Sequence, residues 1–160
     1  MKRLALVALL LFIATAFYSR NIKTAEPADI IDTAAAQGLT KFVAAVALSE
    51  LTESAKAQKP PAPFTVFAPN DAAFAAATNI AQTKAALRPV MKFHVVPGKK
   101  VEKGMLVAGK LESISGSKIE VISATQVKGA SETANIVGEG IACNNGIIYV
   151  IDKVLTPTKE

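Results

Sequence analysis

The side chains best suited to catalysis or metal binding are few and isolated in this sequence. His94 is the one histidine and Cys143 the one cysteine among 160 residues. A thiol and an imidazole form an activated nucleophile when they lie within hydrogen-bond reach, but the residues around neither one resemble such a site. No partner stands at metal-ligand spacing from His94 within FHVVPG (93–98). We therefore expect His94 to be a buried or half-buried residue that forms hydrogen bonds inside the protein, with contact to a ligand as the less favoured alternative.

A second polar group, Asn70 with Asp71, lies within TVFAPNDAAF (65–74), where strand-favouring residues meet an alanine-rich helix start. Asn70 can accept hydrogen bonds from the free amides of the new helix, and Asp71 adds negative charge at its positive end. The pair could also form a polar site, but helix capping explains both residues without a further assumption. We expect this turn to be structural.

Two common signatures of catalysis and phosphate binding are absent from the sequence. There is no Gly-x-Ser-x-Gly elbow. The glycines of GEGIACNNG (138–146) precede a predicted strand and do not open a helix, which is the wrong context for a phosphate loop. The sequence therefore predicts no catalytic centre, no cofactor and no metal site.

A basic patch is predicted around the turn in PGKKVEKG (97–104), which contains Lys99, Lys100 and Lys103. The simpler interpretation is that these lysines are solvated. The functional alternative is a weak attraction to acidic polysaccharide or to an anionic surface. Such an attraction would be sensitive to salt, because exposed charges are screened beyond about 8 to 10 Å.

The elements that must position these residues begin with helices. Apolar residues recur at steps of three and four from 28 to 57, which predicts two or three short helices. Gly38 is expected to end the first in a left-handed turn, and Thr40 or Ser49 to cap later ones. The prolines of QKPPAP (58–63) end this helical run.

A further helix is predicted over 83–93. Thr83 is its expected cap, and Pro89 should kink it or shift its start. HVVPG (94–98) is predicted to be a short strand that ends in a turn.

Short strand-favouring runs separated by Gly, Ser and Asn follow Gly104, a pattern typical of an antiparallel meander or sandwich. Asn144-Asn145-Gly146 is the strongest hairpin signal, because tight hairpin turns need positive φ and these residues tolerate it. Cys143 should be a small buried side chain on a strand. Helices come first and strands later, so the predicted class is α+β.

The N-terminal segment indicates export. Lys2 and Arg3 precede an unbroken apolar run over 4–14, and small residues follow at 14–16. We interpret 1–16 as a signal peptide. An uncleaved membrane anchor is less favoured, since a spanning helix needs about 18 to 20 apolar residues. Residues 17–27 are interpreted as a tether, and 28–157 as one domain. A single cysteine cannot form an intramolecular disulfide in the oxidising space outside the cell.

Composition argues against nucleic acid as a partner. The chain carries 18 basic and 13 acidic residues, and removal of 1–16 leaves a net charge near +3. Aromatic residues make up 6% and tryptophan is absent. The aromatic surfaces that stack on single-stranded bases are therefore scarce.

Four stretches together resemble the hallmark segments of fasciclin-like domains: DIIDTA (29–34), TVFAPNDAAF (65–74), FHVVPG (93–98) and GIIYVIDKVLTP (146–157). They occur in the order and at separations that fit the family, and they span almost the whole predicted domain. Asn70 stands where the family often has threonine, and Phe93 where it usually has tyrosine. The positions that match the family motifs are Thr65, Val66, Phe67, Ala68, Pro69, Asp71, Phe74, His94, Gly146, Val150, Ile151, Asp152 and Pro157.

The resemblance implies a twisted antiparallel β-sandwich or wedge flanked by short helices, without a catalytic centre. It implies a secreted or periplasmic protein that mediates cell adhesion or matrix association by binding a cell-surface or matrix protein or a polysaccharide. The alternative that it implies is a carrier of a hydrophobic small molecule such as a lipid or carotenoid. The oligomeric state is left open.

The alternation of a strand also predicts how TVFAPNDAAF packs. Val66 should point away from Thr65 and Phe67, so that Phe67 is buried on one face. Phe74, on the helix that follows, is expected to return to the same core as Phe67.

Overall fold

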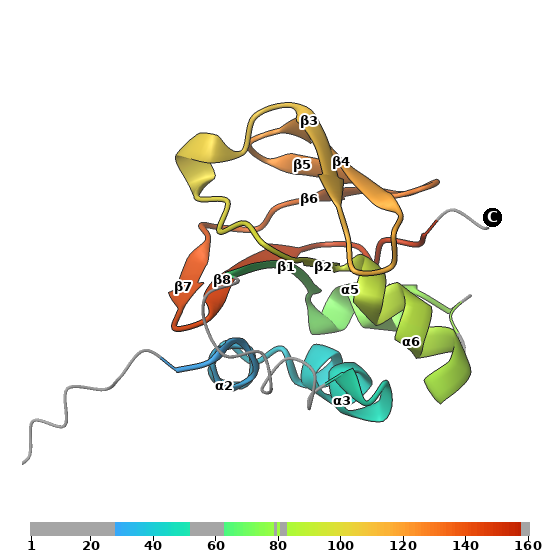
Figure 1. Ribbon diagram of the computed structural model, residues 1–160. Helices are drawn as coiled ribbons and strands as arrows, with labels where there is room; N and C mark the ends of the chain where they lie inside the picture. The colour runs from blue at the N-terminus through green and yellow to red at the C-terminus, as the bar shows by residue number, and fades with distance from the viewer. Residues whose placement is uncertain (1–27, 52–62, 79, 81–82, 158–160) are drawn as a thin grey trace, which may run out of the picture.

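The computed structural model describes residues 28–51, 63–78, 80 and 83–157. The expected signal peptide and tether lie outside the described residues. The described part forms three layers, with one sheet above, a second sheet in the middle and helices below (Figure 1). The helices are α2 (Ile30–Ala36), α3 (Thr40–Leu48), α5 (Asp71–Ala76) and α6 (Lys84–Phe93), with a 3₁₀ turn η1 (Lys103–Met105); the strands are β1 (Phe64–Pro69), β2 (Val95–Val96), β3 (Gly109–Glu112), β4 (Lys118–Ser123), β5 (Gln126–Lys128), β6 (Thr133–Asn135), β7 (Ile141–Cys143) and β8 (Gly146–Ile151).

The first two helices begin and end through local chemistry. The Asp29 carboxylate caps α2 by accepting a hydrogen bond from the Asp32 amide at 2.9 Å. Gly38, with φ of 76°, makes the left-handed turn between α2 and α3, as predicted. Leu39 is the N-cap of α3, so the expected cap at Thr40 is wrong, whereas Ser49 occupies the C-cap position. Thr40 is its first residue, and Ser49 follows its C-terminal end, where the Ser49 hydroxyl donates to the Val46 carbonyl.

Helix α6 runs without interruption from Lys84 to Phe93 and contains Pro89. The start of the helix is not shifted. Thr83 occupies the N-cap position as predicted, although its side chain makes no capping hydrogen bond. One side of α6 is buried through residues one turn apart, so packing compensates for the amide that proline lacks. The buried residues of α6 are Leu87, Val90, Met91 and Phe93.

The described residues contain eight strands, which form two sheets of four. The upper sheet is the antiparallel meander β3-β4-β5-β6, and the middle sheet has the order β2-β1-β8-β7. Strands β1 and β8 are parallel, with Phe64 opposite Gly146 and Pro69 opposite Ile151. The class is α+β, as predicted, but this central pair departs from the expected antiparallel arrangement. The two strands lie far apart in the chain, so no local turn signal indicates their pairing.

Gly146 sits where β8 comes very close to β1. A Cβ atom at this position would lie 2.1 Å from the Phe64 carbonyl oxygen, closer than real Cβ contacts allow. The side chain of any other residue would separate the two central strands. Close backbone approach thus explains the glycine that begins β8.

Every residue of β1 is buried, because the strand has helices on one side and the upper sheet on the other. Val66 and Ala68 belong to the core against the helices, whereas Phe67 belongs to the core between the sheets. Phe74 lies in the helical core with Val66, so its expected return to the core of Phe67 is wrong. The turn at Pro69 carries the chain to the helical side of the middle sheet, which Phe67 does not face.

The β7–β8 hairpin turns at Asn144 and Asn145, as predicted, with Cys143 opposite Gly146. The expected reason is wrong, because none of these turn residues has positive φ. The turn instead binds other segments. The Asn144 amide donates to the Ala28 carbonyl, and the Ile30 amide donates to Oδ1 of Asn145.

Candidate functional site

His94 is fully buried at the C-terminal end of α6. Its Nδ1 lies 2.7 Å from the Val90 carbonyl oxygen and donates to it, because that oxygen can only accept. Its Nε2 accepts a hydrogen bond from the Leu155 amide at 3.0 Å. Both ring nitrogens are therefore used in joining α6 to the C-terminal segment, and neither is available to a substrate.

Burial controls the protonation of this histidine. Loss of hydration lowers the pKa of His94 to about 4, and the hydrogen bond with Val90 opposes that shift only in part. The imidazole is neutral at physiological pH. A neutral ring with both nitrogens occupied cannot act as a general base or a metal ligand in this arrangement.

The turn after β1 is also occupied by internal contacts. The Asn70 side chain accepts a hydrogen bond from the Ala73 amide at 2.7 Å and caps α5. Asp71 reaches a different helix, because its carboxylate accepts hydrogen bonds from the Thr40 hydroxyl and the Lys41 amide at the start of α3. These two hydrogen bonds, that from Thr40 first, lower the pKa of Asp71. Sequence reasoning missed the contact with α3, which joins two helices.

The end of β8 is tied to the upper sheet by Asp152. One carboxylate oxygen accepts from the Asn135 amide at 2.7 Å, and the other accepts from the Asn135 side chain at 2.8 Å. Beyond Asp152, Pro157 is partly buried, as is Val150 before it, and Ile151 is fully buried. The residues of the final motif lie along β8 and the segment that follows it, and they do not converge on a cleft.

The other group with reactive chemistry is Cys143, which is buried on β7 without a disulfide. Burial raises the pKa of its thiol, so the thiolate needed for nucleophilic attack is disfavoured. The described residues contain no group of three or more His, Cys, Asp or Glu side chains that could hold a metal ion. Within the same part of the chain, no helix is long and apolar enough to cross a membrane.

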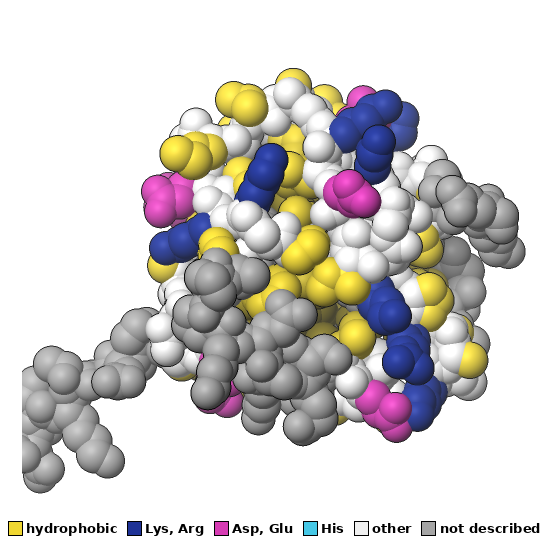
Figure 2. Space-filling model, in the orientation of Figure 1, with side chains coloured by type: hydrophobic (Ala, Val, Ile, Leu, Met, Phe, Trp, Pro, Cys, Tyr) yellow, Lys and Arg dark blue, Asp and Glu magenta, His cyan; other side chains and the backbone are white. Residues whose placement is uncertain are grey.

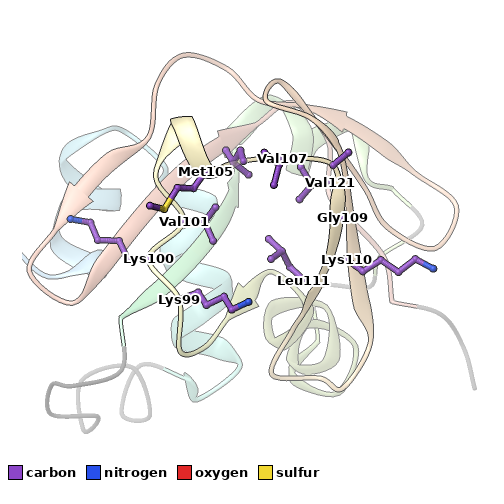
Figure 3. A pocket seen from close by; sticks show the side chains of 11 residues that line it. Lys99, Lys100, Val101, Met105, Val107, Gly109, Lys110, Leu111 and Val121 are labelled. Atoms are coloured by element: carbon purple, nitrogen blue, oxygen red, sulfur yellow. The ribbon is translucent and has the colours of Figure 1, made fainter.

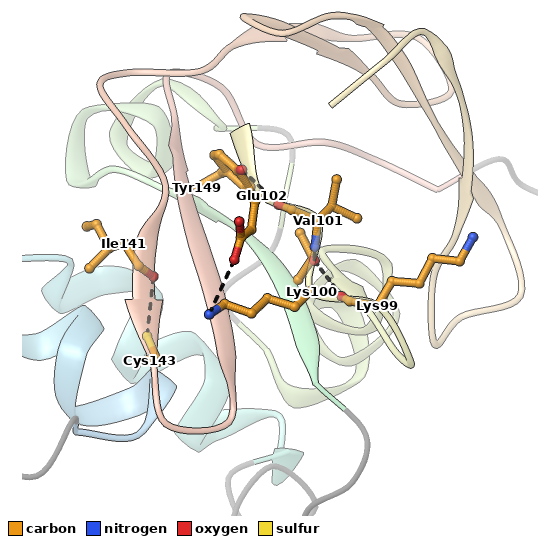
Figure 4. A network of polar contacts seen from close by, with 8 residues as sticks. Lys99, Lys100, Val101, Glu102, Ile141, Cys143 and Tyr149 are labelled. Carbon is orange, nitrogen blue, oxygen red and sulfur yellow. Dashed lines mark hydrogen bonds and ion pairs between the residues drawn. The ribbon is translucent and has the colours of Figure 1, made fainter. Parts of the chain in front are cut away.

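A different feature stands out at the surface: the segment from Lys99 to Val101 is fixed from below by a buried hydroxyl. The Thr65 hydroxyl donates to the Lys99 carbonyl at 2.7 Å and accepts from the Val101 amide at 3.0 Å. Thr65 is fully buried on β1. The central strand thus fixes the backbone of the lysine segment on both sides of Lys100 (Figure 4).

Tyr149 on β8 adds a third bond to the same segment. Its hydroxyl donates to the Val101 carbonyl at 2.8 Å, and its ring stacks on Phe67 with 5.9 Å between ring centroids. Burial raises the pKa of Tyr149 to about 12, so the hydroxyl keeps its proton and remains a donor. Two neighbouring strands therefore hold one exposed segment in place.

The lysine segment forms one wall of an open hollow of about 430 Å³, and β3 and β4 form the opposite wall. Figure 3 shows Lys99 reaching toward Leu111, whereas Lys100 and Lys110 point away from the hollow. The side chain of Lys103 lies outside what the structure describes. The described lining is mostly aliphatic, with three lysines and no carboxylate: Lys99, Lys100, Val101, Met105, Leu106, Val107, Ala108, Gly109, Lys110, Leu111 and Val121.

Met105 and Val107 project from the rim of this hollow. They are 67% and 72% exposed, more than any other large hydrophobic residue in the described part of the chain. Figure 2 shows hydrophobic side chains exposed on this face, with separate groups of Lys and Arg and also Asp and Glu side chains around them. Sequence reasoning named the lysines but missed these two residues, which no helical or strand period distinguishes from core positions.

Replacing Thr65 by valine should loosen the wall of the hollow. The substitution keeps the shape but removes the partner of the buried Val101 amide, and an unpaired buried donor costs about 1 to 3 kcal/mol. We expect a loss of stability in that range and faster hydrogen exchange at the Val101 amide. Thr65→Ser, which keeps the hydroxyl, is the control and should retain slow exchange. Equal exchange rates in Thr65→Val and the wild type would show that Thr65 does not hold this segment.

Comparison with known proteins agrees with this architecture. A family model described as "Fasciclin domain" matches residues 37–157. Protein sll1483 of Synechocystis sp. is 31% identical over 136 residues, which are 80% of this chain and 73% of that protein. Protein sll1735 of the same organism is 35% identical over 102 residues, covering 59% of this chain and 74% of that protein.

More distant similarity extends to animal proteins. Transforming growth factor-beta-induced protein ig-h3 of Oryctolagus cuniculus is 29% identical over 121 residues, which are 72% of this chain but 17% of that protein. The solved FAS1 domain pair of the insect cell adhesion molecule fasciclin I superposes with a TM-score of 0.59 at 14% identity, over 73% of this chain and 44% of that one. At 14% identity, the similarity to the solved structure shows a shared fold only. With a family model matching most of its length, the chain belongs to the fasciclin domain family.

Proposed function

We propose that this protein is a secreted, non-catalytic binding module that mediates cell adhesion or association with extracellular matrix. The observation that carries the proposal is the internal use of its polar motif residues. Asp71 and His94 form their hydrogen bonds to other parts of the same chain, which leaves recognition to the exterior.

Family membership supports the same function. Fasciclin domains are generally associated with adhesion and matrix binding, and a solved relative in fold is an insect cell adhesion molecule. The partner proposed here is a cell-surface or matrix protein or a polysaccharide. Lys99 and Lys100 lie on the exposed surface available to such a partner.

The test is retention of native cell-surface material by the immobilised full chain. We expect retention at least about tenfold above that of an inert protein of similar size and charge, because tenfold corresponds to only about 1.4 kcal/mol of binding energy. Mass spectrometry of the eluate would name the partner. Retention no greater than that of the inert protein would contradict the proposal.

A second candidate function is the carriage of a hydrophobic small molecule. An apolar hollow of about 260 Å³ lies between the helices and the middle sheet and includes Phe42, Phe64 and Met91 in its lining. Sites for drug-sized ligands usually measure about 300 to 1,000 Å³, so this hollow suits a short apolar group. Organic extraction of the purified protein separates the two candidates, since a carrier should yield a bound ligand near one per chain and an adhesion module should yield none.

A further inference from the structure

We propose that the rim of the 430 Å³ hollow docks on an anionic lipid surface, with Met105 and Val107 entering the headgroup region and the surrounding lysines contacting the phosphates. The inference rests on the proposed function, because it names one kind of surface to which the module attaches. At this rim, apolar side chains face water, whereas the polar motif residues form their hydrogen bonds inside the protein.

The apolar part of the argument is the position of two side chains. Met105 ends the 3₁₀ turn η1, and Val107 follows it before β3 begins. Leu106 between them is 4% exposed and belongs to the core between the sheets. Burial of Leu106 thus directs its two neighbours outward and holds them there. Aliphatic side chains projecting from a short turn can enter the interface between headgroups and acyl chains without unfolding the protein.

The charge part of the argument is the set of ionisable residues around the same hollow. Lys99, Lys100 and Lys110 line it, and its described lining contains no carboxylate. Glu102 lies 3.8 Å from the Lys100 ammonium, a long and exposed pair that leaves Lys100 available. Each lysine near an anionic surface strengthens attraction to it.

The residue types around the hollow favour a lipid surface over a folded protein as the partner. Stable protein interfaces usually depend on buried Trp, Tyr or Arg anchors, and none of these residues is among the described residues that line this hollow. Lysine ammonium groups combined with Met and Val are suited to a fluid surface of phosphates and acyl chains.

The underlying segment is held by hydrogen bonds to the central strands, which should lower the entropic cost of docking. Thr65 and Tyr149 hold the backbone at Lys99 and Val101 by three hydrogen bonds from the central strands. The lysine segment would therefore bind without first becoming ordered.

The experiment measures co-sedimentation of the full chain with two kinds of vesicle. One is phosphatidylcholine alone, and the other contains about one-third phosphatidylglycerol as the anionic lipid. Residues 4–14 are apolar and are present in every variant, so their own contribution to lipid binding is the same in each. The quantity compared is therefore the partition coefficient of each variant divided by that of the wild type. We expect about tenfold or stronger partitioning to the anionic vesicles, and most of this preference should disappear between about 0.05 M and about 0.5 M salt.

Two double variants test the two parts of the surface. Met105→Ser with Val107→Ser, and Lys99→Glu with Lys100→Glu, should each reduce partitioning to anionic vesicles by about tenfold. The apolar control is Leu48→Ser, on α3 and 52% exposed. The charge control is Arg88→Glu with Lys92→Glu, on α6, which line a hollow that shares no described residue with this one. Both controls should stay within about twofold of wild type.

The outcomes separate this inference from the proposed function. If neither double variant lowers vesicle binding more than its control, the lipid inference is overturned. If the wild type binds both vesicles equally but still retains native cell-surface material, adhesion stands and its target is not anionic lipid. Loss of vesicle binding in both double variants, with circular dichroism unchanged, supports the inference.

Discussion

Phe67→Ala should lower the free energy of unfolding by about 3 to 5 kcal/mol, a large part of the 5 to 15 kcal/mol typical of a single domain. Phe67 is fully buried in the core between the two sheets and stacks on Tyr149. Truncation removes a ring from the middle of this core and leaves a cavity that the backbone of a central strand cannot easily fill. Tyr149 would also lose the packing that positions its hydroxyl beneath Val101.

Urea denaturation measures this effect, with a shift in midpoint at nearly constant slope. Phe67→Leu is the control and should cost much less, because it retains most of the buried volume. Hydrogen exchange adds a spatial test, since the amides of the upper sheet should lose protection before those of α3. An unchanged melting temperature in Phe67→Ala would show that this core assignment is wrong.

Acid should destabilise the protein through His94 before it does so through the carboxylates. The pKa of this histidine is lowered from 6.5 to about 4 by burial, so the unfolded chain binds a proton that the folded protein excludes between these values. Its contribution to stability is fully present above about pH 6.5 and is lost as the pH falls toward 4. The difference amounts to about 3 kcal/mol, since each pKa unit corresponds to about 1.4 kcal/mol.

The measurement is the free energy of unfolding at a series of pH values, in the wild type and in His94→Gln. The variant should be less stable at neutral pH, because the bonds to Val90 and Leu155 are disturbed. Its stability should, however, change little between pH 6.5 and 5. Asp71 and Asp152 also have lowered pKa values, but their effect falls mainly at lower pH and is shared by both proteins. Equal slopes above pH 5 would contradict the role given to His94.

The sequence predicted the elements whose signals are local. Gly38 forms its left-handed turn, Asn70 caps α5, and the hairpin turns at Asn144 and Asn145. Each depends on residues within a few positions of one another. The family resemblance supplied the assembled fold, which local patterns alone do not specify.

The features that the sequence did not reveal depend on pairing between distant segments. No turn in the sequence indicates the parallel pairing of β1 with β8, because the two strands lie far apart in the chain. The Asp71 carboxylate and the Thr40 hydroxyl, which form a hydrogen bond, are 31 residues apart in the sequence. The core in which Phe74 is buried depends on which side of the middle sheet α5 lies. Met105 and Val107 could not be recognised as surface residues, because their exposure follows from the burial of Leu106 between them.

The pairing of β1 with β8 also affects how the chain folds. Its first contact joins Phe64 to Gly146, the first residue of β8, so β8 must be synthesised before β1 gains its parallel neighbour. Contacts between such distant positions slow folding, because a long loop must close before they form. During synthesis, β1 therefore stays without its parallel partner until β8 has left the ribosome.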